Sequence, residues 1–200
     1  MIADAKDSIE SKSDLFRLAG GMCAEAYTNR VDLGTTEYLS RIVRYKGQAV
    51  QMLAISGTDE PMDWIKNFDM RSRHGIKKAS FDAANEIKKH FKPMRGIPLV
   101  VTGHSKGGAT ALAYTRMFHA DYCVAFCPTR CFRYTINRYL KNATIFMDPD
   151  DIVPKIGFLN FGHPYCEWIY LPDDSPGINI SDHFMDHINE FLSGYERNKK

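Results

Sequence analysis

Short apolar segments alternate with segments of helical periodicity from residue 97 onward, and this alternation limits the possible folds more than any other feature. Strands are predicted at 97–102, 122–127, 143–147 and 166–171, and helices at 105–119, 132–141 and 182–193. Continuous apolar strands joined by helices are typical of a parallel sheet that is covered on both faces. We therefore expect an α/β fold with its functional residues at the carboxyl ends of the strands.

The first half of the chain adds an antiparallel element to this sheet. Two apolar strands, 37–45 and 49–55, are separated by Lys46 and Gly47, which predicts a hairpin. Helices are predicted at 14–28 and 80–91 from the spacing of their apolar residues. The fold class expected from both halves is a mostly parallel central sheet with helices on both faces and an N-terminal antiparallel hairpin.

Composition indicates a globular chain organised as one unit. Hydrophobic residues make up 44% of the 200 residues and charged residues 25%, and no repeat or linker divides the sequence. We expect a single domain over 1–200, with flexible ends at 1–12 and 195–200. A net charge of +2 is too small to favour nucleic acid as a partner, and it allows at most transient contact with a membrane.

Cysteine usage and the N-terminal residues predict a cytoplasmic location. The chain has five cysteines, an odd number that does not suit a disulfide framework and favours a reducing compartment. The first 14 residues, MIADAKDSIESKSD, lack the apolar stretch of a signal peptide. No apolar run approaches the roughly 18 residues that would predict a membrane-spanning helix.

Two clusters of potential metal ligands do not amount to a predicted metal site. Cysteines 123, 127 and 131 repeat every fourth residue, but Pro128 interrupts the run, so buried thiols are the better interpretation. The acidic run at 148–151 resembles the start of a calcium loop without its glycine and later glutamate. We expect neither a metal nor a cofactor.

The sequence GHSKGG at 103–108 joins a predicted strand to a predicted helix. A phosphate-binding P-loop needs Lys-Ser or Lys-Thr after its second glycine, whereas this chain has Ala109 and Thr110. The pattern G-x-S-x-G at a strand-to-helix turn is instead typical of a nucleophile elbow, which exposes a serine hydroxyl. We predict that Ser105 is a nucleophile.

A nucleophilic serine requires a base and an acid that orients the base. In folds of this class the chain order is serine, acid, histidine. His183 follows Ser181 and Asp182 at a predicted helix start, and it is favoured as the base over His187 and His163. The acid is predicted in the loop after the strand at 143–147, where spacing alone leaves Asp148 and Asp151 as alternatives.

Several ordered motifs resemble those of the lipase class 3 family, which belongs to the α/β-hydrolase superfamily. They are Ser56-Gly57-Thr58 with Asp63-Trp64 and Asn67, then GHSKGG, FCPTR at 126–130, Asp151-Ile152-Val153-Pro154, Phe161-Gly162-His163 with Glu167 and Trp168, and His183. The resemblance covers the chain from about Ala54 to the last predicted helix. It implies an α/β-hydrolase-like fold.

The resemblance also implies roles for individual residues. It makes Asp151, within the D-x-V-P motif, the acid of a triad with Ser105 and His183. It implies an oxyanion hole formed by the backbone N–H groups of Thr58 and Lys106, which is chemically sensible because fixed backbone donors need no reorganisation. The short segment between Thr58 and Ser105 leaves little room for a long lid, and a small apolar flap is the alternative to ordinary core for Trp64, Ile65 and Phe68.

The function implied is that of a serine carboxylic-ester hydrolase, a lipase or esterase, acting on a lipid or small acyl ester through an acyl-serine intermediate. Two alternatives use the same fold. One is a catalytically silent binding protein, and the other is an acyltransferase or thioesterase with the same triad. The sequence does not identify the ester or the role of the Lys106 side chain.

Overall fold

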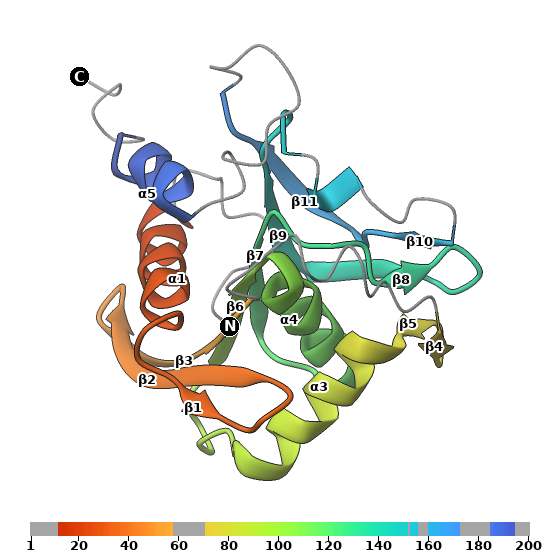
Figure 1. Cartoon of the computed structure of the whole chain (residues 1–200). Coiled ribbons are helices and arrows are strands. Elements are labelled where there is room, and N and C mark those ends of the chain that lie inside the picture. Colours follow the sequence, from red (N-terminus) through yellow and green to blue (C-terminus); the bar gives the residue numbers. More distant parts are fainter. Residues whose placement is uncertain (1–11, 58–70, 152, 156–159, 173–184, 195–200) are drawn as a thin grey trace.

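A seven-stranded sheet runs through the centre of the structure (Figure 1). The computed structural model describes residues 12–57, 71–151, 153–155, 160–172 and 185–194. In spatial order the strands are β1 (Val31–Asp32), β2 (Glu37–Tyr45), β3 (Gln48–Ile55), β6 (Leu99–His104), β7 (Tyr122–Phe126), β9 (Tyr139–Met147) and β11 (Tyr165–Tyr170).

Strand direction divides this sheet into two parts. Strands β1, β2 and β3 pair antiparallel, and every later pair from β3 to β11 is parallel. The hairpin turns at Lys46 and Gly47, where both residues have positive φ values of 46° and 79°. The predicted α/β fold class, the mostly parallel sheet and the N-terminal hairpin are therefore confirmed.

Helices cover both faces of the sheet (Figure 1). Helices α1 (Ser13–Glu25) and α5 (Met185–Gly194) lie on one face, and α3 (Lys78–His90) and α4 (Ser105–Phe118) lie on the other. Alternate strand residues enter the two cores, so that Val100 packs with α1 while Leu99 and Val101 pack with α4. Burial on both faces explains why β6 and β7 are apolar throughout rather than alternating.

A second, four-stranded antiparallel sheet replaces the helix that the sequence predicts at 132–141. It contains β4 (Ser72–Arg73), β5 (Ile76–Lys77), β8 (Phe132–Arg133) and β10 (Phe161–Gly162). The helix prediction is wrong because the four-residue spacing of Phe132, Ile136 and Leu140 arises from tertiary packing. Phe132 pairs with Ile76 across the small sheet, and β9 begins at Tyr139, before Leu140.

Hydrogen bonds in a buried polar cluster connect the start of α1 with the sheet. Lys12 is 5% exposed, and its ammonium group donates to the Tyr122 hydroxyl at 3.1 Å and to the Glu167 carboxylate at 3.2 Å. The Thr144 hydroxyl donates to the same carboxylate oxygen at 2.5 Å. The cluster thereby links the residue before α1 with β7, β9 and β11.

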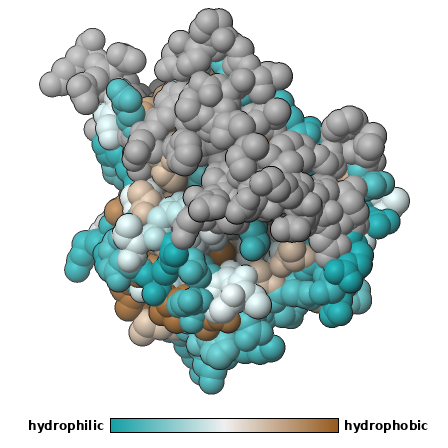
Figure 2. Space-filling view, viewed as in Figure 1, coloured by the Kyte–Doolittle hydropathy of each residue, from teal (hydrophilic) through white to brown (hydrophobic). Residues whose placement is uncertain are grey.

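The surface seen in Figure 2 is largely hydrophilic where the residues are described, and its hydrophobic atoms gather over the hairpin of β1 and β2. Val31 and Ile42 on these strands are 48% and 53% exposed. Within the described part of the chain, no helix combines the length and the apolar character that crossing a bilayer requires.

We predict that Lys12→Met lowers the free energy of unfolding by about 1–3 kcal/mol, because Glu167 would keep its negative charge in a partly buried site without a cation. Urea unfolding followed by circular dichroism measures the change. Lys89→Met is the matched control, since Lys89 and Glu86 form a comparable pair at 2.7 Å on the surface. The control should shift stability by less than about 0.5 kcal/mol, and equal effects of the two variants would contradict the structural role of Lys12.

Candidate active site

Ser105 lies at the turn between β6 and α4, where the backbone is strained. Its φ of 57° falls in the left-handed region, which costs a non-glycine residue about 1–2 kcal/mol. The residue is 2% exposed, and its hydroxyl has no hydrogen-bond partner among the described residues. The strand-to-helix turn predicted for GHSKGG is therefore present, with a strained serine as its first helical residue.

Close packing between α4 and the end of β3 explains the glycine at position 107. A Cβ atom there would overlap the carbonyl oxygen of Ile55 and lie 2.7 Å from the carbonyl carbon of Ser56. A Cβ atom at Gly103 would in turn overlap the carbonyl of Gly107. Both glycines of the G-x-S-x-G pattern are thus required by backbone-to-backbone contact, which holds the first turn of α4 against β3.

This contact also brings together the two segments assigned to the oxyanion hole. Ile55 pairs with Gly103 in the parallel register of β3 and β6, so Gly57 and Lys106 lie at the same edge of the sheet. Thr58, the other predicted donor, falls outside the described residues. So do Trp64, Ile65 and Phe68, the residues of the predicted flap.

The residue before Ser105 is held by a side chain from the N-terminal part of the chain. The Tyr27 hydroxyl lies 2.8 Å from Nδ1 of His104, whose side chain is buried. A Cβ atom on Gly57 would also overlap this hydroxyl. Tyr27 therefore contacts both the turn that contains Ser105 and the segment after β3. Sequence reasoning missed it because no local pattern connects positions 77 residues apart.

Asp151 and Asp148 lie in the loop after β9, two strands along the sheet from Ser105. Asp151 is fully buried and its Oδ1 accepts the backbone N–H of Val153 at 2.8 Å. Asp148 is 4% exposed, and its Oδ1 accepts the N–H of Asp150 at 2.9 Å. Both carboxylates are thus held by their own loop at the carboxyl edge where the sequence predicts the acid.

Cys127 joins the end of β7 to this acidic loop. Its N–H donates to the carbonyl of Phe146 at 2.8 Å, and its φ of 40° is also left-handed. Burial raises the pKa of its thiol well above 9.0, and the negative charge of Asp151 adds to the effect. The thiol therefore stays protonated beside the carboxylate at neutral pH.

Two further contacts hold the segment that follows Asp151. The Pro154 carbonyl, in the short 3-10 helix Val153–Lys155, accepts a hydrogen bond from Nε of Arg130 at 2.9 Å. It also lies 3.3 Å from Nε2 of His163, so this nitrogen carries the proton. Burial, followed by the charge of Arg130, lowers the pKa of His163 to about 4. His163 is a neutral residue that supports the loop.

The other candidate bases are not placed by the structure. His183 lies outside the described residues. His187 belongs to α5, but its side chain is likewise outside what is described. The predicted triad therefore has two of its members described, Ser105 and Asp151, at the carboxyl ends of strands that flank β7.

The described residues contain no group of three or more histidine, cysteine, aspartate or glutamate side chains arranged to hold a metal ion. Cys123, Cys127 and Cys131 are all fully buried free thiols. Burial raises the pKa of each above the ordinary value of 9.0. Their regular spacing thus reflects packing in the core.

Comparison with known proteins assigns this arrangement to a family. The family model described as lipase (class 3) matches residues 52–161. That range contains the last four residues of β3, the strand-to-helix turn at Ser105 and the acidic loop. No curated protein matches the sequence.

Solved structures of lipases share the fold at low sequence identity. A triacylglycerol lipase described as having a serine protease triad at its catalytic centre is 15% identical, with a TM-score of 0.65 over 88% of this chain and 94% of that one. The lipase of Rhizopus microsporus var. chinensis is 17% identical, with a TM-score of 0.62 over 91% and 84%. The native Rhizomucor miehei lipase–propeptide complex is 16% identical, with a TM-score of 0.60 over 85% and 71%. The fold is α/β-hydrolase-like.

We predict that Gly107→Ala destabilises the protein by at least about 2 kcal/mol and abolishes any activity of Ser105, because the new methyl group must push α4 away from β3. Chemical unfolding and esterase assays measure the two effects. Gly21→Ala in α1 is the control, since a Cβ atom there meets nothing within 4 Å. The control should leave stability equal or improve it by up to about 1 kcal/mol. A stable, active Gly107→Ala protein would contradict the close contact.

Proposed function

Because the chain belongs to the lipase class 3 family and is a serine ester hydrolase, we propose that it cleaves a lipid or small acyl ester with a Ser105–His183–Asp151 triad. The observation that carries this proposal is the strained backbone of Ser105 at the strand-to-helix turn. Strain of this kind persists only where the surrounding structure enforces it, and it is concentrated at functional sites.

In the first step the Ser105 hydroxyl oxygen attacks the ester carbonyl while His183 takes its proton. The backbone N–H groups of Lys106 and Thr58 stabilise the resulting oxyanion. The fixed contact between Gly107 and the end of β3 supports this role, because it leaves the Lys106 N–H little freedom to move. His183 then protonates the leaving alcohol, and Ser105 remains acylated.

In the second step His183 removes a proton from water, which attacks the acyl-serine. Collapse of the tetrahedral intermediate releases the carboxylic acid and returns the proton to Ser105. Asp151 orients the imidazole and stabilises its charged form throughout. Each of the two carboxylates accepts one backbone N–H of its own loop, and the complete burial of Asp151 supports this assignment over Asp148, which is 4% exposed.

A fluorophosphonate probe should label the wild-type protein, whereas Ser105→Ala should not react. The probe forms a covalent bond with an activated serine hydroxyl, so labelling tests for a nucleophile rather than for a fold. Gel fluorescence measures the label, and circular dichroism confirms that both proteins are folded. A folded wild-type protein that stays unlabelled would favour the alternative of a silent binding protein.

We expect Asp151→Asn to lower kcat for a p-nitrophenyl ester by about 10³–10⁴-fold, because the amide holds the histidine in the wrong tautomer. Asp148→Asn is the matched change in the same loop and should lower kcat by less than about tenfold. Steady-state kinetics distinguishes the two carboxylates. The reverse order of effects would assign the acid to Asp148.

A further inference from the structure

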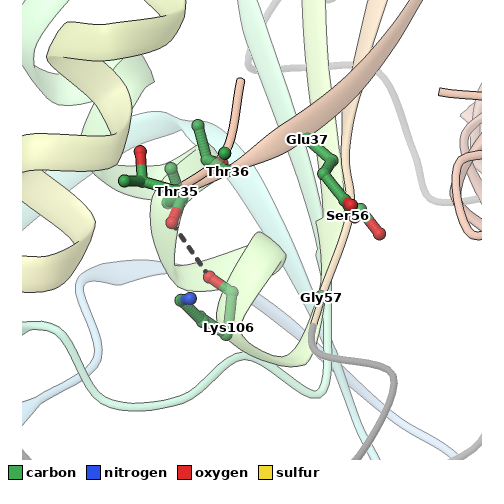
Figure 3. A pocket seen from close by; sticks show the side chains of 8 residues that line it. Thr35, Thr36, Glu37, Ser56, Gly57 and Lys106 are labelled. Carbon is green, nitrogen blue, oxygen red and sulfur yellow. Dashed lines mark hydrogen bonds between the residues drawn. The ribbon is translucent and has the colours of Figure 1, made fainter. Parts of the chain in front are cut away.

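A small polar pocket lies beside the start of α4, next to the turn that joins β1 to β2 (Figure 3). We call it the Lys106 pocket. It has a volume of about 210 Å³ and is lined by Thr35, Thr36, Glu37, Ser56, Gly57 and Lys106, among others. Pockets for whole small-molecule ligands measure about 300–1,000 Å³ and are mostly apolar. The Lys106 pocket therefore suits one polar group of a larger ligand rather than an acyl chain.

The Lys106 pocket adjoins the atoms assigned to catalysis. Lys106 directly follows Ser105, and Gly57 directly precedes Thr58. The contact of Gly107 with Ile55 and Ser56 fixes these two segments against each other. When the ester group of a ligand lies at Ser105, another part of the same ligand can therefore reach the Lys106 pocket.

The charges around the Lys106 pocket favour an anion. The first turn of α4 contains no acidic residue, so the positive end of its helix dipole is not neutralised. Lys106 brings an ammonium group to that turn, and the ion pairs found among the described residues do not include it. The carboxylate of Glu37 is balanced by Arg30, 2.7 Å away. Figure 3 shows the Lys106 side chain extending from α4 toward the side where Thr35 lies.

The lining also offers an unused hydroxyl group. Ser56 is 6% exposed, and its Oγ has no hydrogen-bond partner within the described residues. A buried hydroxyl without a partner is costly, and an acceptor bound in the pocket would remove that cost. Thr110 does not compete for the same ligand, because its hydroxyl donates to the Lys106 carbonyl at 3.0 Å.

We infer that the Lys106 pocket binds the phosphate group of the substrate, so that the preferred substrates are lipid esters whose headgroup carries a phosphate. A lysine ammonium group, a helix N-terminus and hydroxyl donors together match the several acceptor oxygens of phosphate. The inference rests on the proposed function, since it assumes that the ester is cleaved at Ser105.

The first test compares two substrates that carry the same ester, 1-oleoyl-glycerol 3-phosphate and 1-oleoyl-glycerol, each below its aggregation limit. Wild-type kcat/KM should be at least tenfold higher for the phosphate. Lys106→Met should reduce this ratio about tenfold, and Lys106→Arg should preserve most of it. Ratios are compared because the Lys106 backbone belongs to the oxyanion hole. Lys89→Met, at an exposed lysine of α3, is the control and should leave the ratio unchanged.

The second test measures binding without turnover. Glycerol 3-phosphate is titrated into Ser105→Ala protein by calorimetry, with inorganic phosphate as a separate titrant. The headgroup role requires tighter binding of glycerol 3-phosphate, and a Ser105→Ala/Lys106→Met protein should bind it about tenfold more weakly. Lys89→Met in the same background should bind it unchanged.

The outcomes separate this inference from the proposed function. The phosphate assignment is overturned if neither titrant binds. It is also overturned if the wild-type enzyme shows no preference between the two oleoyl esters. Either result leaves the Ser105 chemistry intact. Equal binding of inorganic phosphate and glycerol 3-phosphate assigns the pocket to free phosphate and overturns the headgroup role. Hydrolysis that persists in Ser105→Ala overturns the proposed function, while the binding results still decide the pocket.

Discussion

The site depends on one contact, between the backbone of α4 at Gly107 and the carbonyl groups at the end of β3. Because nothing larger than a hydrogen atom fits between them, the first turn of the helix is fixed against the sheet. Ser105 must then connect β6 to α4 through a left-handed backbone conformation. The same contact sets the positions of the Lys106 N–H and of Gly57, so the geometry of Ser105 and that of the proposed oxyanion hole are determined together.

Two features at the start of α4 lower the stability of the helix. A left-handed residue at the turn and a lysine at the positive end of the dipole are both unfavourable for an isolated helix. The complete burial of the helix from Gly107 to Thr115 offsets these costs through packing on the sheet and on α3. Residues and backbone conformations that disfavour an isolated helix, yet occur in a well-packed one, are expected where function requires them.

The sequence predicts the central sheet and its hairpin because their patterns are local. Apolar runs bounded by glycine and charged residues mark β3, β6 and β7 within a few positions of their observed ends. The small sheet was missed because Phe132 pairs with Ile76, a partner far away in the chain. Lys12 and Glu167, and likewise Tyr27 and His104, are also far apart in the sequence. Periodicity reports which face of an element is buried, and it carries no information about such partners.

In the acidic loop, the motif and the structure give different kinds of support for one of the two aspartates. The spacing after the strand allows either Asp148 or Asp151 as the acid. The choice of Asp151 in the sequence rests on the resemblance of its D-x-V-P motif to that of the family. In the structure Asp151 is the more deeply buried of the two, and the turn after it is held at the Pro154 carbonyl by Arg130 and His163. Because Arg130 comes from the segment after β7, the loop is tied to the strand next to the one that carries Ser105. A carboxylate that accepts a hydrogen bond within a loop fixed in this way can keep a histidine in one orientation, which is the requirement that a triad places on its acid.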